Sequence, residues 1–282
     1  MRHLLSIGLL FPSLAFAAAE GVKTTATDLF EIGGWPISNS ILTTWIIAGL
    51  IIIAVRLLVG TPKIIPNRGQ ALVENVASGL RDSLEPIVGK RMIGKTFPVL
   101  CGFFVFILLM NWSGLLPGVG TIKYQAANGD WLDAIRPANS DLNTTLALSI
   151  ISFASWTYFV LRYAGLKALV YDLFGNKADK KELSTPMWLM LGFIFLGVGG
   201  IEVLSIASRL ISLPFRLYGN VFGGENLIHT LGGLAPYVVP AFAGLLEVLV
   251  GLIQAFVFTL LSAVYIGLIC NHEGGHEDEH AH

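Results

Sequence analysis

Residues 201–226 read IEVLSIASRLISLPFRLYGNVFGGEN and lie inside an almost entirely apolar stretch that runs from 187 to 271. Glycines and prolines at 232, 233, 236 and 240 interrupt this stretch near its middle, which predicts two long helices joined by a tight turn. A helix over 236–269 would measure about 50 Å, against about 30 Å for the hydrocarbon core of a bilayer, so it must tilt strongly or lie partly against protein. A division of 187–234 into two spans, at Arg209 and Pro214, stays open.

The composition of the whole chain indicates a polytopic membrane protein. Of its 282 residues, 54% are hydrophobic and 13% are charged, and the mean hydropathy is +0.70, which is too apolar for a soluble domain of this length. The formal net charge of -1 excludes the strongly basic character of a nucleic-acid-binding protein. Cys101 and Cys270 are far apart and form neither a disulfide framework nor a CxxC motif, so they are expected to be packing residues.

The amino-terminal part, 39–182, predicts three further membrane helices and one amphipathic helix. Uncharged or nearly uncharged runs at 39–59, 96–122 and 142–161 are the candidate spans. Over 66–84 apolar residues recur on one helical face, which is typical of a helix lying along the membrane surface. Together with the hairpin at 183–271, the expected fold is all-α, with about five membrane helices, one interfacial helix, and long, tilted helices at the end.

Two signals give the same orientation. Residues 1–18 have a basic start, a short apolar core and small residues after it, as in a cleavable signal peptide, which places the mature amino terminus outside. Twelve Lys and Arg residues fall in loops on one side of the predicted membrane and three on the other, so the richer side is cytoplasmic and the carboxyl terminus lies there. The tail, 272–282, is rich in His and acids; a disordered, solvated segment is favoured over a weak metal site.

Ionisable side chains inside the carboxyl-terminal block are the candidate functional groups, because each charge at membrane depth costs about 2.5 to 3.5 kcal/mol. Glu202, Arg209 and Arg216 recur every seven residues and share one helical stripe, with Asn220 one turn further on. Arg209 can simply pair with Glu202. Arg216 has no acid within four residues, and since arginine cannot deprotonate in a protein it is a candidate electrostatic gate.

A second set of groups can exchange protons. Glu225 lies nine residues after Arg216, on the opposite side of the helix, and His229 stacks over it one turn later. On the last predicted helix Glu247 and Gln254 share a stripe of an otherwise apolar segment and could face Arg216 and Glu225 across the hairpin.

The string at 201–226 closely resembles the signature of subunit a of F-type ATP synthases. Three further strings look like the same family: NWSGLLPG at 111–118, RPANSDLNTTLALS at 136–149, and EVLVGLIQAFVFTLLSAVYIG at 247–267. The resemblance runs from about Ile41 to Ile269. It implies a proton-translocating stator subunit of the plasma (inner) membrane whose partners are the subunit c ring, subunit b, the other ATP synthase subunits and membrane lipid, with no nucleic acid, cofactor or metal. Sodium in place of protons stays open, because the rotor ring chooses the ion.

The resemblance also implies roles for single residues. Arg216 would face the carboxylate of each passing subunit c, assisted by Asn220 and Gln254. Glu225 and Glu247 would line an outer aqueous half-channel, and Glu202 would lie near the ion path. Asp141 and Asn143 would form a polar entrance near the third span. His229 has no role in the resemblance, although it could share a proton with Glu225.

The sequence differs from the family's pattern at two positions, and two other functions are weighed against it. Many relatives have proline directly after the position of Arg209, whereas this chain has Leu210 there and proline at Pro214; an acid that some relatives have before the LLP string is replaced by Ser113. A self-contained secondary transporter would also bury ionisable residues, but no internal repeat is found. A membrane scaffold would use the charges only for helix pairing. The sequence contains no GxxxxGK[ST] loop, so no catalysis of ATP chemistry is expected from this chain alone.

Overall fold

The computed structural model describes residues 26–116, 119, 122–125, 131–175, 185–232 and 238–270. The predicted signal peptide at 1–18 and the tail at 272–282 lie outside the described residues. The chain divides into two compact units. The first is Met1–Glu74, Phe103–Ala147 and Pro214–Val257, and the second is Asn75–Gly102, Leu148–Leu213 and Phe258–His282.

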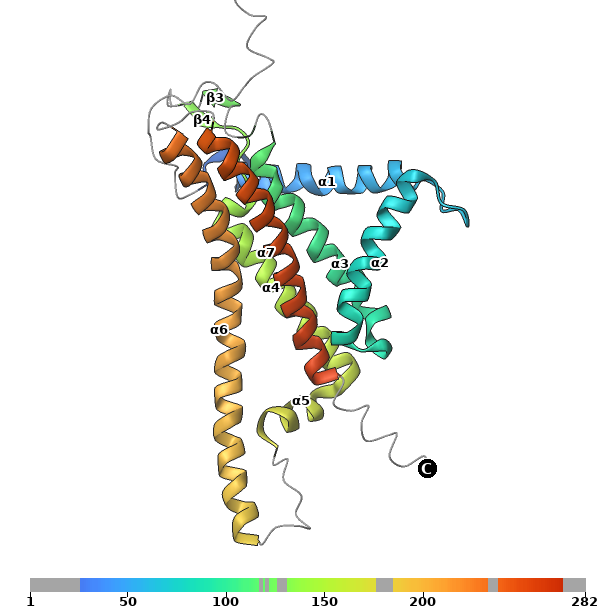
Figure 1. Cartoon of the computed structure of the whole chain (residues 1–282). Helices are drawn as coiled ribbons and strands as arrows, with labels where there is room; N and C mark the ends of the chain where they lie inside the picture. The colour runs from blue at the N-terminus through green and yellow to red at the C-terminus, as the bar shows by residue number, and fades with distance from the viewer. Residues whose placement is uncertain are drawn as a thin grey trace, which may run out of the picture. The chain divides into compact units, whose positions relative to one another are not determined.

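The described chain is built from helices, with two short hairpins (Figure 1). Five helices are long and apolar enough to cross a membrane, which confirms the predicted all-α polytopic class. The elements in chain order are β1 (Asp28–Ile32), β2 (Trp35–Ser38), α1 (Asn39–Val59), α2 (Arg68–Val88), α3 (Lys90–Trp112), the 3₁₀ turn η2 (Ser113–Leu115), β3 (Lys123–Gln125), β4 (Trp131–Asp133), the 3₁₀ turn η3 (Ala138–Ser140), α4 (Leu142–Phe159), the π-helical turn η4 (Val160–Ala164), α5 (Gly165–Phe174), α6 (Thr185–Gly232) and α7 (Val238–Cys270).

Helix α1 has the bounds that the sequence predicts, and its two ends have local causes. Ser38 caps the start by accepting a hydrogen bond from the main-chain nitrogen of Ile41. The hairpin that precedes it turns at Gly33 and Gly34, whose φ values of 61° and 87° suit a tight turn between antiparallel strands. At the other end Gly60 takes a φ of 58° and closes the helix.

The first unit has a small apolar core beside a surface suited to lipid. Ile47 of α1, Met110 of α3 and Ala138 of η3 form the core, and Ile51 and Phe106 pack against it. The remaining apolar side chains of α1 are largely uncovered, so that only 11% of its most apolar window is buried. An apolar helix that protein leaves uncovered is expected to contact lipid.

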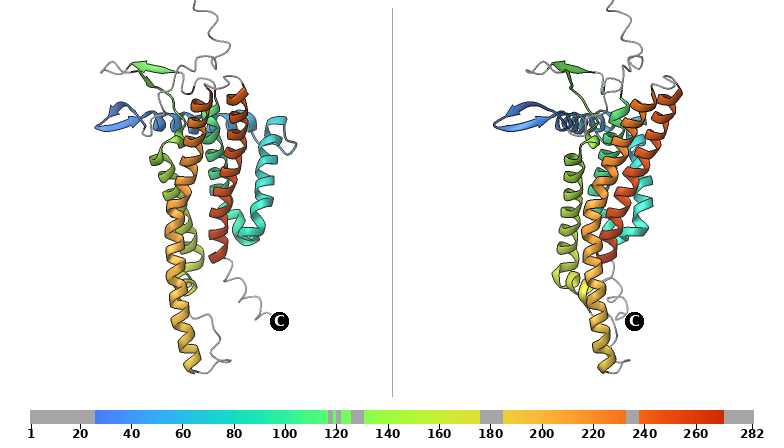
Figure 2. Two further views of the ribbon diagram at one scale, coloured as in Figure 1. Left: turned by 60° about the vertical axis from the view of Figure 1, so that its left-hand side comes forward. Right: turned by 90° about the vertical axis from the view of Figure 1, so that its left-hand side faces the viewer.

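Within this unit, α1 crosses the stretches of α6 and α7 at a steep angle instead of running beside them (Figures 1 and 2). The 21 residues of α1 make about 32 Å of helix, which matches a hydrocarbon core of about 30 Å. The 48 residues of α6 make about 72 Å, more than twice that thickness. A membrane that α1 crosses directly therefore holds these stretches of α6 and α7 strongly inclined, and the tilt of the two whole helices stays a prediction.

Helix α6 is continuous from Thr185 to Gly232, with Pro214 inside it. The division of this region into two spans, which the sequence left open, is therefore wrong, and the alternative of one long helix is right. Helix α7 starts at Val238, so Pro240 falls in its first turn, where the missing N–H of proline does no harm.

The predicted amphipathic helix is divided between the units, with 66–74 in the first and 75–84 in the second. Helix α2 runs to Val88, beyond the predicted end at 84, because Pro86 is accommodated in its last turn. Of the predicted apolar face, Leu80 and Leu84 are buried, whereas Leu72 and Val76 are exposed in the described chain. Its position along a membrane surface stays a prediction.

Gly267 lets α7 approach α2 closely within the second unit. A Cβ atom at Gly267 would overlap the main-chain oxygen of Ile87 at the end of α2, whereas a Cβ at Gly102 of α3 would meet nothing within 4 Å. We expect Gly267→Ala to lower the thermal stability of the assembled protein, since α7 must shift away from α2. Gly102→Ala should leave it unchanged or raise it by up to about 1 kcal/mol, because alanine favours helix. Thermal melting of the detergent-solubilised complex compares the two; equal melting temperatures would contradict the close packing.

Candidate functional site

Arg216 lies on α6 with its side chain exposed at the surface of the first unit. At this point α6 has one face packed against the protein and one exposed face: Leu217 is 1% exposed and Phe215 is 52% exposed. Among the described residues Arg216 makes no hydrogen bond or ion pair. A charge at membrane depth that this chain leaves unpaired is available to a group outside it.

Asn220, one turn after Arg216, lies on the lining of a small cavity between α3, α6 and α7. The cavity measures about 10 Å³, enough for about one water molecule. Glu247 and Gln254 of α7 line the same cavity. The structure therefore brings together three of the predicted site residues. The Glu247 stripe meets α6 at Asn220, and a position facing Arg216 and Glu225 stays a prediction.

Two glycines make room for the Glu247 carboxylate. A Cβ atom at Gly224 of α6 would lie 3.3 Å from Oε1 of Glu247, and one at Gly114 of η2 would lie 3.7 Å from the same oxygen. Among the described residues Glu247 makes no hydrogen bond or ion pair. A half-buried carboxyl group with this freedom can accept or release a proton without breaking a structural contact.

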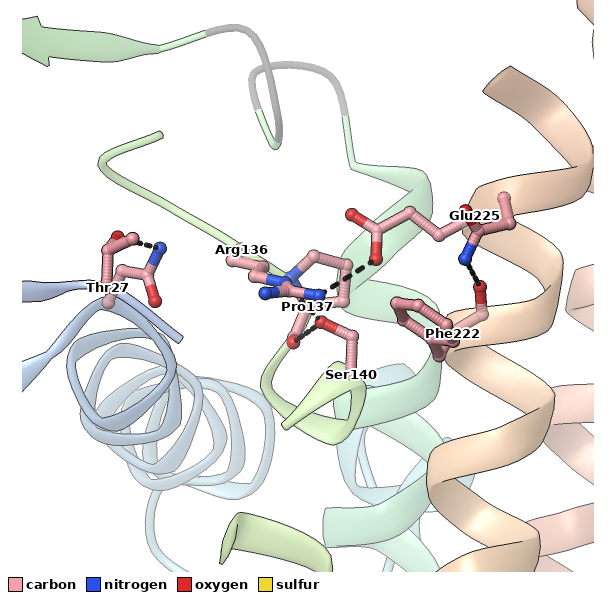
Figure 3. Close-up of polar contacts among 8 residues, drawn as sticks. Thr27, Arg136, Pro137, Ser140, Phe222 and Glu225 are labelled. Atoms are coloured by element: carbon pink, nitrogen blue, oxygen red, sulfur yellow. Dashed lines mark hydrogen bonds and ion pairs between the residues drawn. The ribbon is translucent and has the colours of Figure 1, made fainter. Parts of the chain in front are cut away.

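Glu225 follows Gly224 on α6 and points toward Arg136, which lies just before η3 (Figure 3). Nη2 of Arg136 and Oε2 of Glu225 are 3.8 Å apart, and the two side chains are 6% and 18% exposed. Arg136 also donates from Nε to Oγ of Ser140 at 2.8 Å, which fixes the guanidinium. Two partly dehydrated charges at this distance attract one another strongly.

The segment after Arg136 connects three helices of the first unit. Nδ2 of Asn139 donates to Oδ1 of Asn111 at 2.7 Å, and Nδ2 of Asn111 donates to the main-chain oxygen of Gly251 on α7 at 3.0 Å. Asp141 accepts from Oγ of Ser40 on α1 at 2.8 Å. A chain of buried hydrogen bonds of this kind holds its helices in one arrangement.

Asp141 and Asn143, which were expected to form a polar entrance, differ in burial. Asp141 is buried and also accepts from the main-chain nitrogen of Asn143 at 3.2 Å, whereas the side chain of Asn143 is exposed. The contacts of Asp141 are those of a structural link between α1 and the start of α4. A role for either residue as an entrance stays a prediction.

The second unit contains a larger cavity, of about 270 Å³, between α4, α6 and α7. Arg209 forms part of its wall: Nη2 donates to Oε1 of Glu202 at 3.2 Å and to Oγ of Ser205 at 2.6 Å, and the guanidinium carbon lies 3.8 Å from the ring centre of Tyr265. The predicted pairing of Arg209 with Glu202 is therefore observed. Ser152 and Ser262, whose hydroxyls are 2.9 Å apart, add polar groups to the lining. This cavity can hold several waters beside a carboxylate.

Part of the polar cluster around Arg136 and Asn111 in the first unit was not predicted from the sequence. Arg136 was counted only as a loop charge, and Asn111, Asn139 and Ser140 were not assigned any role. A possible signal was the concentration of polar residues in RPANSDLN, directly before an apolar span. His229 is a helical residue of α6 whose side chain lies outside the described part of the structure.

Comparison with known proteins decides the family. A family model described as ATP synthase A chain matches residues 41–267, most of the chain. The chain belongs to this family. Among curated members of the ATP synthase A chain family, the ATP synthase subunit a 2 of Bradyrhizobium sp. strain BTAi1 is 31% identical over 244 residues, which cover 86% of this chain and 93% of the relative. The matched range nearly coincides with the resemblance expected from about 41 to 269.

Removal of Arg136 should destabilise the first unit, because Glu225 would lose the cation beside it. We expect Arg136→Ala to cost up to about 3 kcal/mol and to reduce the assembled complex. The double variant Arg136→Ala/Glu225→Gln should recover part of this loss, since it leaves no carboxylate to neutralise. Lys123→Ala, which removes an exposed cation from β3, is the control. Equal thermal stabilities of the Arg136 and Lys123 variants would contradict a structural ion pair.

Proposed function

We propose that this chain is the proton-translocating stator subunit of the membrane sector of a rotary ATP synthase, and that Arg216 is the gate that faces the carboxylates of the subunit c ring. The observation that carries the proposal is the exposed position of Arg216 on a long apolar helix, without a hydrogen bond or ion pair among the described residues. An arginine paired within the chain, as Arg209 is, would instead suit a scaffold.

The two polar clusters support two half-channels. In the first unit Glu247 lines a small cavity, and Glu225 lies beside the buried Arg136. In the second unit Glu202 lies beside a cavity that can hold water. We assign the first cluster to the outer half-channel and the second to the cytoplasmic one, which agrees with an amino terminus outside and a carboxyl terminus in the cytoplasm.

The mechanism follows from charge. A proton from the outer side passes along the carboxyl groups at Glu225 and Glu247 and neutralises a carboxylate on the ring, which can then turn through lipid. When that site approaches Arg216, the fixed positive charge stabilises its ionised form, so the proton is released toward the cytoplasmic cavity. Arg216 also repels cations that would pass straight between the half-channels. The membrane potential supplies about 2.3 kcal/mol per charge per 100 mV.

Partners and location follow from the same proposal. The chain works in the bacterial plasma membrane with the c ring, subunit b and the other ATP synthase subunits, and those other subunits carry out the ATP chemistry. Protons are the transported ion proposed here, and a ring that binds sodium would make the same path a sodium path. The transporter reading is disfavoured because Arg216 faces outward without a partner in the described chain.

Replacement of Arg216 tests the gate. In inverted vesicles that contain the assembled complex, Arg216→Ala should abolish ATP-driven proton pumping, because ring carboxylates would no longer be ionised beside the stator. Arg56→Ala, which removes an exposed arginine from the last turn of α1, should leave pumping unchanged. Normal pumping by an assembled Arg216→Ala complex would refute the gate and favour the scaffold or transporter.

Access to the second-unit cavity tests the cytoplasmic half-channel. In a background in which Cys101 and Cys270 are replaced by serine, Ser152→Cys should react with a small, water-soluble thiol reagent added to the cytoplasmic side, and pumping should fall. Ser155→Cys, on the same helix but outside the cavity lining, is the control, because Ser155 is half-buried and its hydroxyl donates to the main-chain oxygen of Ile151 in its own helix. Equal reaction of both cysteines, or none at Ser152→Cys, would contradict the assignment of the cavity to the ion path.

A further inference from the structure

Pro214 creates a defect in the hydrogen bonding of α6 two residues before Arg216. In an α-helix the main-chain nitrogen of residue 214 would donate to the oxygen of residue 210. Proline has no N–H, and its ring presses against that same carbonyl, so the oxygen of Leu210 loses its usual α-helical donor. In lipid such a carbonyl is costly to leave without a partner, because no water is available to it.

Ser149 of α4 supplies the missing donor. Its Oγ donates to the main-chain oxygen of Leu210 at 3.0 Å, and both residues belong to the second unit. Ser149 is 2% exposed, so the bond is formed away from solvent. Serine side chains are among the groups that can satisfy carbonyls freed by proline in membrane helices.

The other serines of α4 have different partners. Ser152 is paired with the hydroxyl of Ser262, and Ser155 donates to the carbonyl of Ile151 in its own helix. Of these three serines, Ser149 alone bonds to a main-chain carbonyl of α6, and that carbonyl is the one that Pro214 leaves without its usual α-helical donor. The hydroxyl of Ser149 therefore bonds to the one α6 carbonyl whose helical donor Pro214 removes. Ordinary packing between helices would not explain this choice of carbonyl.

We infer that Ser149 is a positioning residue: its hydroxyl replaces the helical hydrogen bond that Pro214 cannot make, and so fixes the course of α6 immediately before Arg216. Proline is a recognised cause of bending in a helix, because it removes one hydrogen bond and presses on the carbonyl one turn earlier. A bond from α4 to that carbonyl holds the backbone at this weak point, and Arg216 follows within one helical turn. The functional consequence rests on the proposed role of Arg216 as the gate.

A comparison in two backgrounds tests this inference. Ser149→Ala is made in the natural chain and in Pro214→Ala, where residue 214 again has an N–H for the oxygen of Leu210. In the natural chain Ser149→Ala should lower ATP-driven pumping per assembled complex about fivefold, the factor that corresponds to about 1 kcal/mol. In the Pro214→Ala background the same change should have little effect relative to its parent. Ser149→Thr, which retains the hydroxyl, and Ser155→Ala should both pump normally.

The outcomes separate the positioning role from mere packing. An equal loss in both backgrounds, or no loss in the natural chain, would overturn the inference. If Ser149→Ala prevents assembly, recovery of assembly and pumping by Ser149→Ala/Pro214→Ala supports it, and failure of the double variant overturns it.

A second measurement separates this inference from the proposed gate. Amide hydrogen exchange of the α6 segment 208–218 in the assembled complex should become faster in Ser149→Ala and return to the parental rate with Pro214→Ala. Arg216→Ala is assayed for pumping in parallel. Normal pumping by Arg216→Ala refutes the gate whatever the exchange result. Changed exchange with unchanged pumping in Ser149→Ala, while Arg216→Ala is inactive, keeps the gate and overturns the positioning role.

Discussion

A hydrocarbon environment offers no water to polar groups, and each unsatisfied carbonyl or charge there costs several kcal/mol. The polar residues of this chain are arranged in three ways that meet this constraint. Some are paired within the chain, as Glu202 is with Arg209 and Asp141 is with Ser40. Others line cavities large enough for water, as Asn220 and Glu247 do. Arg216 stands apart, since among the described residues it has no partner and is exposed. An exposed charge with no partner among the described residues is therefore the observation on which the proposed role of Arg216 rests.

The same constraint explains why the two polar clusters need different supports. In the first unit, amides and hydroxyls of Asn111, Asn139 and Ser140 hold short segments against the helices, and the carboxyl groups lie beside glycines. In the second unit, one arginine is held by a carboxylate, a hydroxyl and an aromatic ring, with an open cavity beside it. Rigid hydrogen bonding suits groups that must keep a fixed geometry, while an open cavity suits exchange with water.

Sequence reasoning succeeded where local signals decide the structure. The bounds of α1 follow from an uncharged run between a serine cap and a glycine, and the five spans follow from hydropathy. It could not decide whether α6 is continuous, because proline usually ends or bends a helix. The hydroxyl that replaces the hydrogen bond lost at Pro214 comes from Ser149 of α4, 65 positions earlier in the chain. The burial of Arg136 was missed for a similar reason. A charged residue in a loop is usually solvated, and only the fold brings Glu225 beside it. The stripe from Glu202 to Arg216 was predicted correctly as a helical pattern, yet the structure places its two ends in different units.

The length of α6 also bears on how the protein is made. A helix of 48 residues is too long to remain upright in a bilayer, so its insertion has to end with a reorientation toward the membrane plane. During that step Glu202, Arg209 and Arg216 pass through states in which their final surroundings are incomplete. The polar groups that we propose guide ions are therefore also groups whose charges are costly in lipid until α6 reaches its final position together with the partners that cover it.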